Sequence, residues 1–112
     1  MSEGDSRRVP RPPRLVRAAN RPWFVYILRC STGTLYTGST NDLAARELAH
    51  NQGRGARYTA GRRPVRVVYS EVHESRSAAQ KRESQLKRWT RARKEALVAG
   101  DEIRAQLGTG PL

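Results

Sequence analysis

The alternation of apolar and polar positions predicts a β-hairpin near the start of the chain. An apolar run over residues 23–30 is followed by a polar turn containing Gly33 and by a second short run over 35–38. Glycine adopts the positive φ that a tight reversal needs. Because side chains alternate between the two faces of a strand, Tyr26 and Tyr36 can meet on one face of the sheet. The pattern alone leaves open whether these tyrosines serve the core or a site.

The rest of the pattern predicts helices and one further strand. After the hairpin come a helix from a cap at 40–42 to about His50, a strand over 65–72, a helix from Ser75 or Ser77 to Trp89, and a helix over 90–99 stopped by Gly100. Alternation within the third strand places Val65, Val67 and Tyr69 on one face and Val68 and Val72 on the other. The predicted order of elements is therefore β-β-α-β-α-α.

Charge is the strongest compositional signal. The chain of 112 residues suits one domain, and it carries 22 Lys and Arg against 10 Asp and Glu, a formal net charge of +12. Such an excess indicates an anionic partner, most commonly nucleic acid, although an acidic membrane surface or simple solubility would also account for it. No apolar run is long enough to span a membrane, and no signal-peptide pattern opens the chain.

Composition also divides the chain into three parts. Residues 1–21 are rich in proline and arginine and are expected to form a disordered basic tail, with at most a loose attraction to phosphates. Residues 22–99 form the expected domain, and residues 100–112 a short extension. The single cysteine, Cys30, excludes an internal disulfide and suits a reducing cytoplasm.

Polar residues in the later segments allow both functional and structural interpretations. Arg46 and His50 are four residues apart, so they share a helix face as a cationic pair or as a solvated polar surface. Residues 53–64 form a glycine- and arginine-rich loop that either cradles phosphates or stays solvated. Glu83 lies at the edge of an apolar stripe, where a carboxylate needs a metal, a cation or hydrogen bonds. A structural ion pair with Arg82 or another cation at the edge of the core is the plainer explanation of Glu83.

Two tripeptides in the hairpin bring these residues together. Val25-Tyr26-Ile27 and Tyr36-Thr37-Gly38 resemble the two halves of the GIY-YIG nuclease signature. The matching residues that follow in order are Asn41-Asp42-Leu43, Arg46, His50-Asn51, Tyr58-Thr59, Arg63-Pro64, Ala79, Glu83, Leu86-Lys87 and Trp89. From about Pro22 to Ala99 the chain is similar to small, single-domain bacterial members of this superfamily, which also includes excision-repair, junction-resolving, homing and restriction nucleases.

This resemblance implies a fold and a mechanism. The fold is an α/β (α+β) domain with a small, mainly antiparallel three-stranded sheet flanked by helices. The site takes one divalent metal ion, Mg or Mn, held mainly by Glu83. Tyr26, Tyr36 or His50 removes a proton from the attacking water, and the resemblance does not say which. Arg46 stabilises the charge that develops on the phosphate.

The same resemblance implies an interface with nucleic acid, most likely DNA. The expected binding residues are Gly38, Arg54, Arg57, Tyr58, Arg62, Arg63 and Lys87. Gly38 also leaves room for another group to approach the backbone. A DNA partner implies a cytoplasmic, nucleoid-associated protein with no membrane partner, while the oligomeric state stays unknown.

Some residues depart from the signature. Val25 replaces the leading glycine of the first motif and Thr37 the central residue of the second, both common variations. Ser39 stands where excision-repair relatives carry a lysine, so that base is absent here. Glu47 occupies a usually apolar position with Leu48 next to it, so the helix face with Arg46 is either rotated or more exposed. No counterpart appears over 90–99 for the asparagine that some restriction enzymes carry.

Two classes of function follow from the sequence. The first is a metal-dependent DNA endonuclease that selects single-stranded, branched or damaged DNA by its shape. The second is a non-catalytic module that keeps this fold and binds DNA or RNA. The complete set of Tyr26, Tyr36, Arg46, His50 and Glu83 favours the enzyme.

Overall fold

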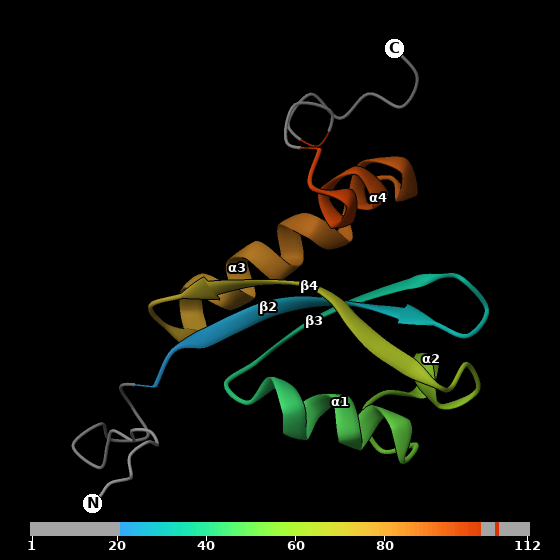
Figure 1. Ribbon diagram of the computed structural model, residues 1–112. Helices are drawn as coiled ribbons and strands as arrows, with labels where there is room; N and C mark the ends of the chain where they lie inside the picture. Colours follow the sequence, from blue (N-terminus) through green and yellow to red (C-terminus); the bar gives the residue numbers. More distant parts are fainter. Residues whose placement is uncertain (1–20, 102–104, 106–112) are drawn as a thin grey trace, which may run out of the picture.

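The fold is a three-stranded antiparallel sheet with helices on both faces, as predicted (Figure 1). The computed structural model describes residues 21–101 and 105. In chain order the elements are β2 (Trp23–Cys30), β3 (Leu35–Thr40), α1 (Leu43–Asn51), α2 (Arg57–Ala60), β4 (Val65–His73), α3 (Arg76–Lys87) and α4 (Arg91–Ala99). Strand β2 lies in the centre, between β3 and β4. The predicted tail over 1–20 and most of the extension over 100–112 lie outside the described residues.

The hairpin between β2 and β3 closes through a tight turn. Cys30 donates its backbone N–H to Thr34 at 2.9 Å, and Gly33 donates to Cys30 at 2.8 Å. Gly33 has φ of 90°, a conformation that glycine adopts without the steric cost of a Cβ. The turn fixes the register in which Tyr26 lies opposite Gly38 and Leu28 opposite Tyr36. Both tyrosines therefore lie on the same face of the sheet, as predicted.

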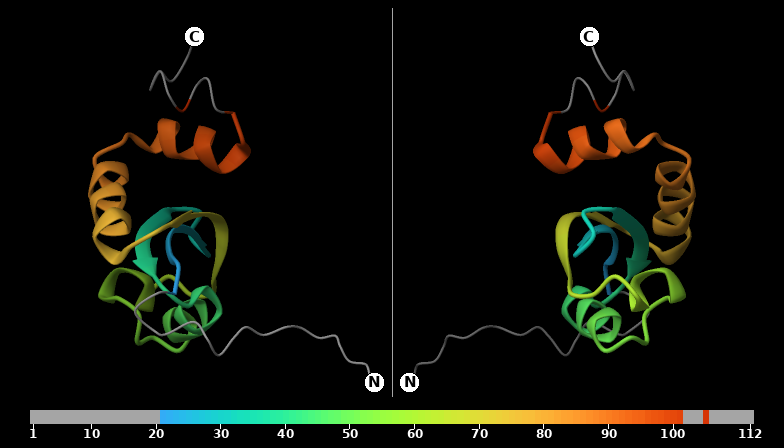
Figure 2. Two further views of the ribbon diagram at one scale, coloured as in Figure 1. Left: turned by 90° about the vertical axis from the view of Figure 1, so that its left-hand side faces the viewer. Right: turned by 90° about the vertical axis from the view of Figure 1, so that its right-hand side faces the viewer.

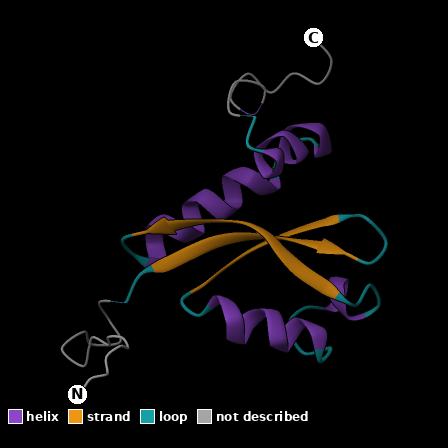
Figure 3. Cartoon of the chain, in the orientation of Figure 1, coloured by secondary structure: helices purple, strands orange, loops and turns teal. Residues whose placement is uncertain are grey.

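That face carries the first core cluster. Tyr26, Leu28, Cys30 and Val65 are buried there, with Tyr36, Leu43 and Val67 packed against them. Leu43 comes from α1, and Figure 3 shows α1 and α2 together below the sheet. The tyrosines are thus covered by the first two helices.

The opposite face carries the second core cluster. Val25, Ala79 and Leu86 are buried, with Trp23, Trp89 and Leu97 packed against them. These residues join β2 to α3 and α4, which curve together around the side of the sheet away from α1 (Figure 2). The sheet is consequently the middle layer of the domain.

Strand β4 contains a bulge that the sequence pattern does not show. Ile27 pairs with Tyr69, whereas the next residue, Leu28, pairs with Val67, so Val68 is an extra residue. The bulge reverses the alternation, and Tyr69 lies on the face of Ile27 and not on that of Val67. The prediction that Val65, Val67 and Tyr69 share a face was wrong for Tyr69. The prediction that Val72 lies on the other face was also wrong, because Val72 pairs with Phe24 and so shares the face of Val65 and Val67.

The helix ends agree with the predicted caps, with two exceptions. Asp42, Ser75 and Thr90 accept N-cap hydrogen bonds, and Gly100 ends α4 with φ of 82°. Helix α3 ends at Lys87, so Trp89 follows the helix and does not belong to it. The loop between α1 and β4 contains the one-turn helix α2, which was not predicted. Within the described residues, no helix is both long enough and apolar enough to cross a membrane.

Candidate active site at the edge of the sheet

The ring of Tyr26 crosses over the neighbouring strand at Gly38. A Cβ at position 38 would lie 2.4 Å from the Tyr26 hydroxyl and 2.6 Å from its Cζ atom. Only glycine leaves the ring this path, because carbon atoms cannot approach so closely. The group that approaches the backbone of Gly38 is therefore Tyr26 itself. Tyr26 is 2% exposed and its hydroxyl reaches His50 of α1.

His50 is the centre of a chain of hydrogen bonds. Its Nδ1 lies 2.8 Å from the Thr59 hydroxyl, and its Nε2 lies 3.0 Å from the Tyr26 hydroxyl. The Thr59 hydroxyl lies 3.1 Å from the Ala56 carbonyl, and when it donates there its oxygen accepts from Nδ1–H. Nε2 of the neutral imidazole then carries the lone pair, and Tyr26 donates its proton to it. In the sequence, Thr59 only matches the signature beside Tyr58, and no role was predicted for it.

Burial decides the protonation of both members of this pair. Burial lowers the pKa of His50, and the nearby Arg46 cation lowers it further, so the imidazole is neutral at pH 7. Burial also raises the pKa of Tyr26 above 10.0, with Tyr36 and Glu83 adding to the rise while Arg46 opposes it. The resting state is therefore a neutral phenol donating to a neutral imidazole.

The lowered pKa of His50 predicts a pH-dependent stability. The unfolded chain binds a proton at His50 below about pH 6.5, whereas the folded chain binds it only at lower pH. The free energy of unfolding should therefore rise with pH through this window and level off above it. Denaturant titrations between pH 5 and 7 measure the slope, which His50→Gln should reduce. An equal slope in both proteins would show that His50 titrates normally in the fold.

Arg46 is held by the loop that follows its own helix. Its guanidinium donates to the Gly55 carbonyl at 3.1 Å. Gly55 also lies against the imidazole, since a Cβ there would be 2.3 Å from His50 Nδ1. Sequence reasoning missed Gly55, because its role depends on a contact between two segments.

The α1 helix is fastened to β4 by two side chains. Glu47 accepts from the backbone N–H of Val67 at 2.8 Å, and Asn51 bonds both the N–H and the carbonyl of Val65. Glu47 therefore faces the sheet, and its apolar neighbour Leu48 is 57% exposed. This pairing explains the carboxylate at a usually apolar position and fixes the direction in which α1 presents its polar face.

Tyr36 begins a column of stacked groups beside His50. Its ring centroid lies 5.3 Å from that of His50 and 6.0 Å from that of Tyr58, with which it is stacked. The Arg62 guanidinium covers the Tyr58 ring at 3.9 Å, and Lys87 Nζ lies 5.9 Å from the Tyr36 ring. Both tyrosines are thus packed by protein groups, and cations stand at each end of the column.

Glu83 lies on the other side of β3 from His50. Its carboxylate accepts from the Ser39 hydroxyl at 2.7 Å and pairs with Lys87 Nζ at 2.9 Å. Arg82 instead pairs with Glu71 at 2.8 Å, so the cation that pairs with Glu83 is Lys87 and not Arg82. Within the described residues no cluster of three or more His, Cys, Asp or Glu could hold a metal. Glu83 is therefore a lone carboxylate, which suits a hard ion that keeps its water and takes substrate oxygens.

The arginines of the loop over residues 53–64 differ in whether their guanidinium groups form hydrogen bonds within the protein. Arg62 donates to the Tyr58 carbonyl at 2.6 Å, and Arg63 donates to the Ala60 carbonyl at 2.7 Å. Arg54 contacts the Gln52 side chain. Arg57 is exposed and has no partner within the described part of the chain. The loop is thus ordered by its own arginines, which still present cationic charge at the surface.

The described residues form a small α+β domain. The family model described as "GIY-YIG catalytic domain" matches residues 22–96 of the chain. The chain therefore belongs to the GIY-YIG family, which confirms the resemblance seen in its sequence and indicates an endonuclease superfamily.

Similar proteins are found in bacteria. The UPF0213 protein of Staphylococcus aureus strain Mu3 is 52% identical over 75 residues, which cover 67% of this chain and 92% of the relative. The UPF0213 protein SAV0488 of strain Mu50 matches to the same extent. A solution NMR structure of the UPF0213 protein BH0048 from Bacillus halodurans is 41% identical, with a TM-score of 0.46 over 70% of this chain and 83% of that one.

Proposed function

We propose that this protein is a metal-dependent endonuclease that hydrolyses phosphodiester bonds in DNA. The observation that carries the proposal is the chain of hydrogen bonds from Tyr26 through His50 to Thr59. A phenol that already donates to a neutral imidazole has an outlet for its own proton. Such an outlet is what a group needs if it is to take a proton from water.

The proton path starts at the Tyr26 oxygen. As an attacking water gives its proton to this oxygen, Tyr26 passes its own proton to His50 Nε2. The raised pKa of Tyr26 disfavours a free phenolate, so the two transfers occur together. The resulting imidazolium keeps its Nδ1–H bond to Thr59, which orients the ring. Tyr36, which is half-buried, serves as a second hydroxyl beside the phosphate.

In this proposal, positive groups on both sides of β3 stabilise the negative charge of the phosphate. Arg46, anchored to Gly55, supplies a guanidinium for the phosphate oxygens on one side. Glu83 on the other side would hold Mg or Mn, which would offset charge on the leaving oxygen. The ammonium group of Lys87, which pairs with Glu83 at 2.9 Å, would contact the substrate phosphates on the same side.

The substrate is selected by shape in this proposal. The described residues form one small domain, and hydrogen bonds to phosphate and sugar carry no sequence information. Single-stranded, branched or damaged DNA offers backbones that an edge site can reach. A substrate of this kind lies at the nucleoid, in the cytoplasm. A non-catalytic binding module would need the same cationic surface, so cleavage decides between the two classes.

A cleavage panel tests the proposal. The full chain is incubated with labelled single strands, duplexes, flaps and four-way junctions, in Mg, in Mn and in chelator. We expect metal-dependent nicking that favours a substrate with unpaired strands. Binding without cleavage on every substrate in both metals would assign the protein to the non-catalytic class.

Binding itself should depend steeply on salt. The chain has a net charge of +12, and each phosphate neutralised on duplex DNA contributes about −0.9 to the slope of log affinity against log salt. Fluorescence anisotropy between low and moderate salt measures this slope. A slope near zero would contradict an electrostatic interface built on residues 53–63.

A further inference from the structure

A pocket along the free edge of β3 lies next to the candidate active site and shares Tyr36 and Lys87 with it. The pocket has a volume of about 270 Å³ and is lined by Leu35, Tyr36, Thr37, Tyr58, Lys87 and Lys94. Tyr36 forms a wall shared with the site, because its ring also contacts His50. A group bound in this pocket would therefore lie one step along the substrate from the reacting phosphate.

Thr37 supplies the first sign that the pocket takes a ligand. The residue is 3% exposed, and its hydroxyl is buried with no hydrogen-bond partner. Thr37 lies on β3 opposite Ile27, facing the layer of α3 and α4. A buried hydroxyl without a partner is unfavourable and uncommon, and it calls for a ligand or water.

The backbone of β3 adds further donors at the same place. Cys30 donates to Thr34 at the hairpin end, so the alternation of an antiparallel ladder makes Leu35 and Thr37 members of non-hydrogen-bonded pairs. Their N–H groups point away from β2, towards the free edge. Because β3 is the edge strand, no other strand of the described sheet pairs with them.

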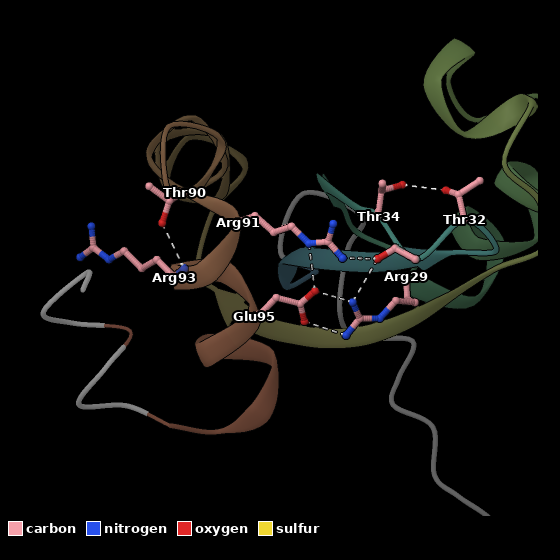
Figure 4. Close-up of polar contacts among 8 residues, drawn as sticks. Arg29, Thr32, Thr34, Thr90, Arg91, Arg93 and Glu95 are labelled. Atoms are coloured by element: carbon pink, nitrogen blue, oxygen red, sulfur yellow. Dashed lines mark hydrogen bonds and ion pairs between the residues drawn. The ribbon is translucent and has the colours of Figure 1, made fainter. Parts of the chain in front are cut away.

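Helix α4 brings the second cation. Lys94 lines the pocket and has no partner among the described residues. Figure 4 shows how α4 is fixed there: Arg29 forms two bonds to Glu95, at 2.6 and 2.8 Å, and Arg91 donates to the carbonyl of Gly33 at 3.0 Å. These contacts tie α4 to the hairpin turn and hold Lys94 beside β3.

We propose that this pocket binds a phosphodiester group of the substrate strand, namely the group next to the phosphodiester that is cleaved. The pocket offers donors to an anion: the ammonium groups of Lys87 and Lys94, the hydroxyl of Thr37 and the outward N–H groups of β3, which alternate with outward carbonyls. The inference rests on the proposed function, since it takes nucleic acid as the ligand. It assigns a binding role to Thr37 and Lys94, and it makes α4 part of the interface.

Matched variants of the full chain test the pocket through binding, with labelled single-stranded DNA as the probe. Lys94→Gln should weaken binding severalfold and make the salt slope shallower by about 0.7, the value for one phosphate on a single strand. Lys94→Arg should restore both. Lys81→Gln removes an exposed cation from α3 outside the pocket and is the control. Equal losses in Lys94→Gln and Lys81→Gln would overturn the proposal.

A neutral phosphate analogue locates the contact. Single methylphosphonates are placed in turn along the probe, and one position should weaken wild-type binding but have no further effect on Lys94→Gln. Thr37→Val should lose affinity at the same position while its melting temperature rises, because the unpartnered hydroxyl is gone. A methylphosphonate effect that persists in Lys94→Gln, or unchanged affinity in Thr37→Val, would overturn the pocket as a phosphate site.

Cleavage is scored separately, so that the two proposals can fail independently. If no substrate is cut but the Lys94 and methylphosphonate effects appear, the pocket stands and the catalytic function falls. If DNA is cut and the pocket variants behave like Lys81→Gln, the function stands and the pocket falls.

Discussion

Glu83→Gln is expected to abolish cleavage while leaving the fold and DNA binding intact. Among the described residues, the carboxylate has a serine hydroxyl and the exposed Lys87 as partners, and glutamine keeps the bond to Ser39. The lost ion pair is of the i,i+4 kind, so the free energy of unfolding should change by less than about 1 kcal/mol. Loss of the metal site removes several kcal/mol of transition-state stabilisation, which is about a thousandfold or more in rate.

Glu71→Gln is the matched control for this experiment. Glu71 accepts hydrogen bonds from Arg82 and Tyr69 and pairs with His73, on the sheet face that α3 covers. Its replacement should destabilise the fold by more than about 1 kcal/mol and leave cleavage intact. Melting temperature, affinity and cleavage are measured for both variants. A large drop in melting temperature with preserved cleavage in Glu83→Gln would make Glu83 a structural residue.

Tyr26→Phe is expected to lower the cleavage rate by about 10²- to 10⁴-fold, the usual contribution of a general base. The substitution keeps the ring over Gly38 and removes only the hydroxyl that bonds His50. Stability should fall by about 1 kcal/mol, one hydrogen bond's worth, and affinity for DNA should stay the same. Single-turnover cleavage at saturating protein separates the rate from binding.

Tyr69→Phe provides the comparison for the tyrosine experiment. Tyr69 also loses a hydrogen bond, to Glu71, but on the opposite face of the sheet. It should cost similar stability and leave cleavage unchanged. Tyr36→Phe belongs in the same series, and full activity in both Tyr26→Phe and Tyr36→Phe would remove the tyrosines from the mechanism.

The hairpin and the order of elements were predictable because they depend on local pattern. Apolar runs, turn residues and caps act within a few positions of one another, and Gly33 adopts the positive φ that its turn required. The bulge at Val68 was not predictable in this way. Val67, Val68 and Tyr69 are all apolar, so an inserted residue leaves the pattern unbroken while turning Tyr69 to the other face.

The site was only partly predictable because its geometry depends on contacts between distant segments. The signature identified both Tyr26 and His50 as candidate site residues. It did not predict the hydrogen bond between them, because they are 24 positions apart in the sequence. Thr59 fixes the tautomer of the imidazole through the one-turn helix α2, which no pattern indicated. The partner of Glu83 is Lys87 and not its sequence neighbour Arg82, since only the packing of α3 decides which side chains face β3.

The contact of Gly55 with His50 has a consequence for how substrate is sensed. One short backbone segment both supports the imidazole and, through its carbonyl, holds Arg46. Under the proposed function, nucleic acid bound by residues 53–63 would therefore shift both the imidazole that accepts the proton and the guanidinium that faces the phosphate. A strand that fits the loop poorly would then bind with lower affinity, and once bound it would also be cleaved more slowly.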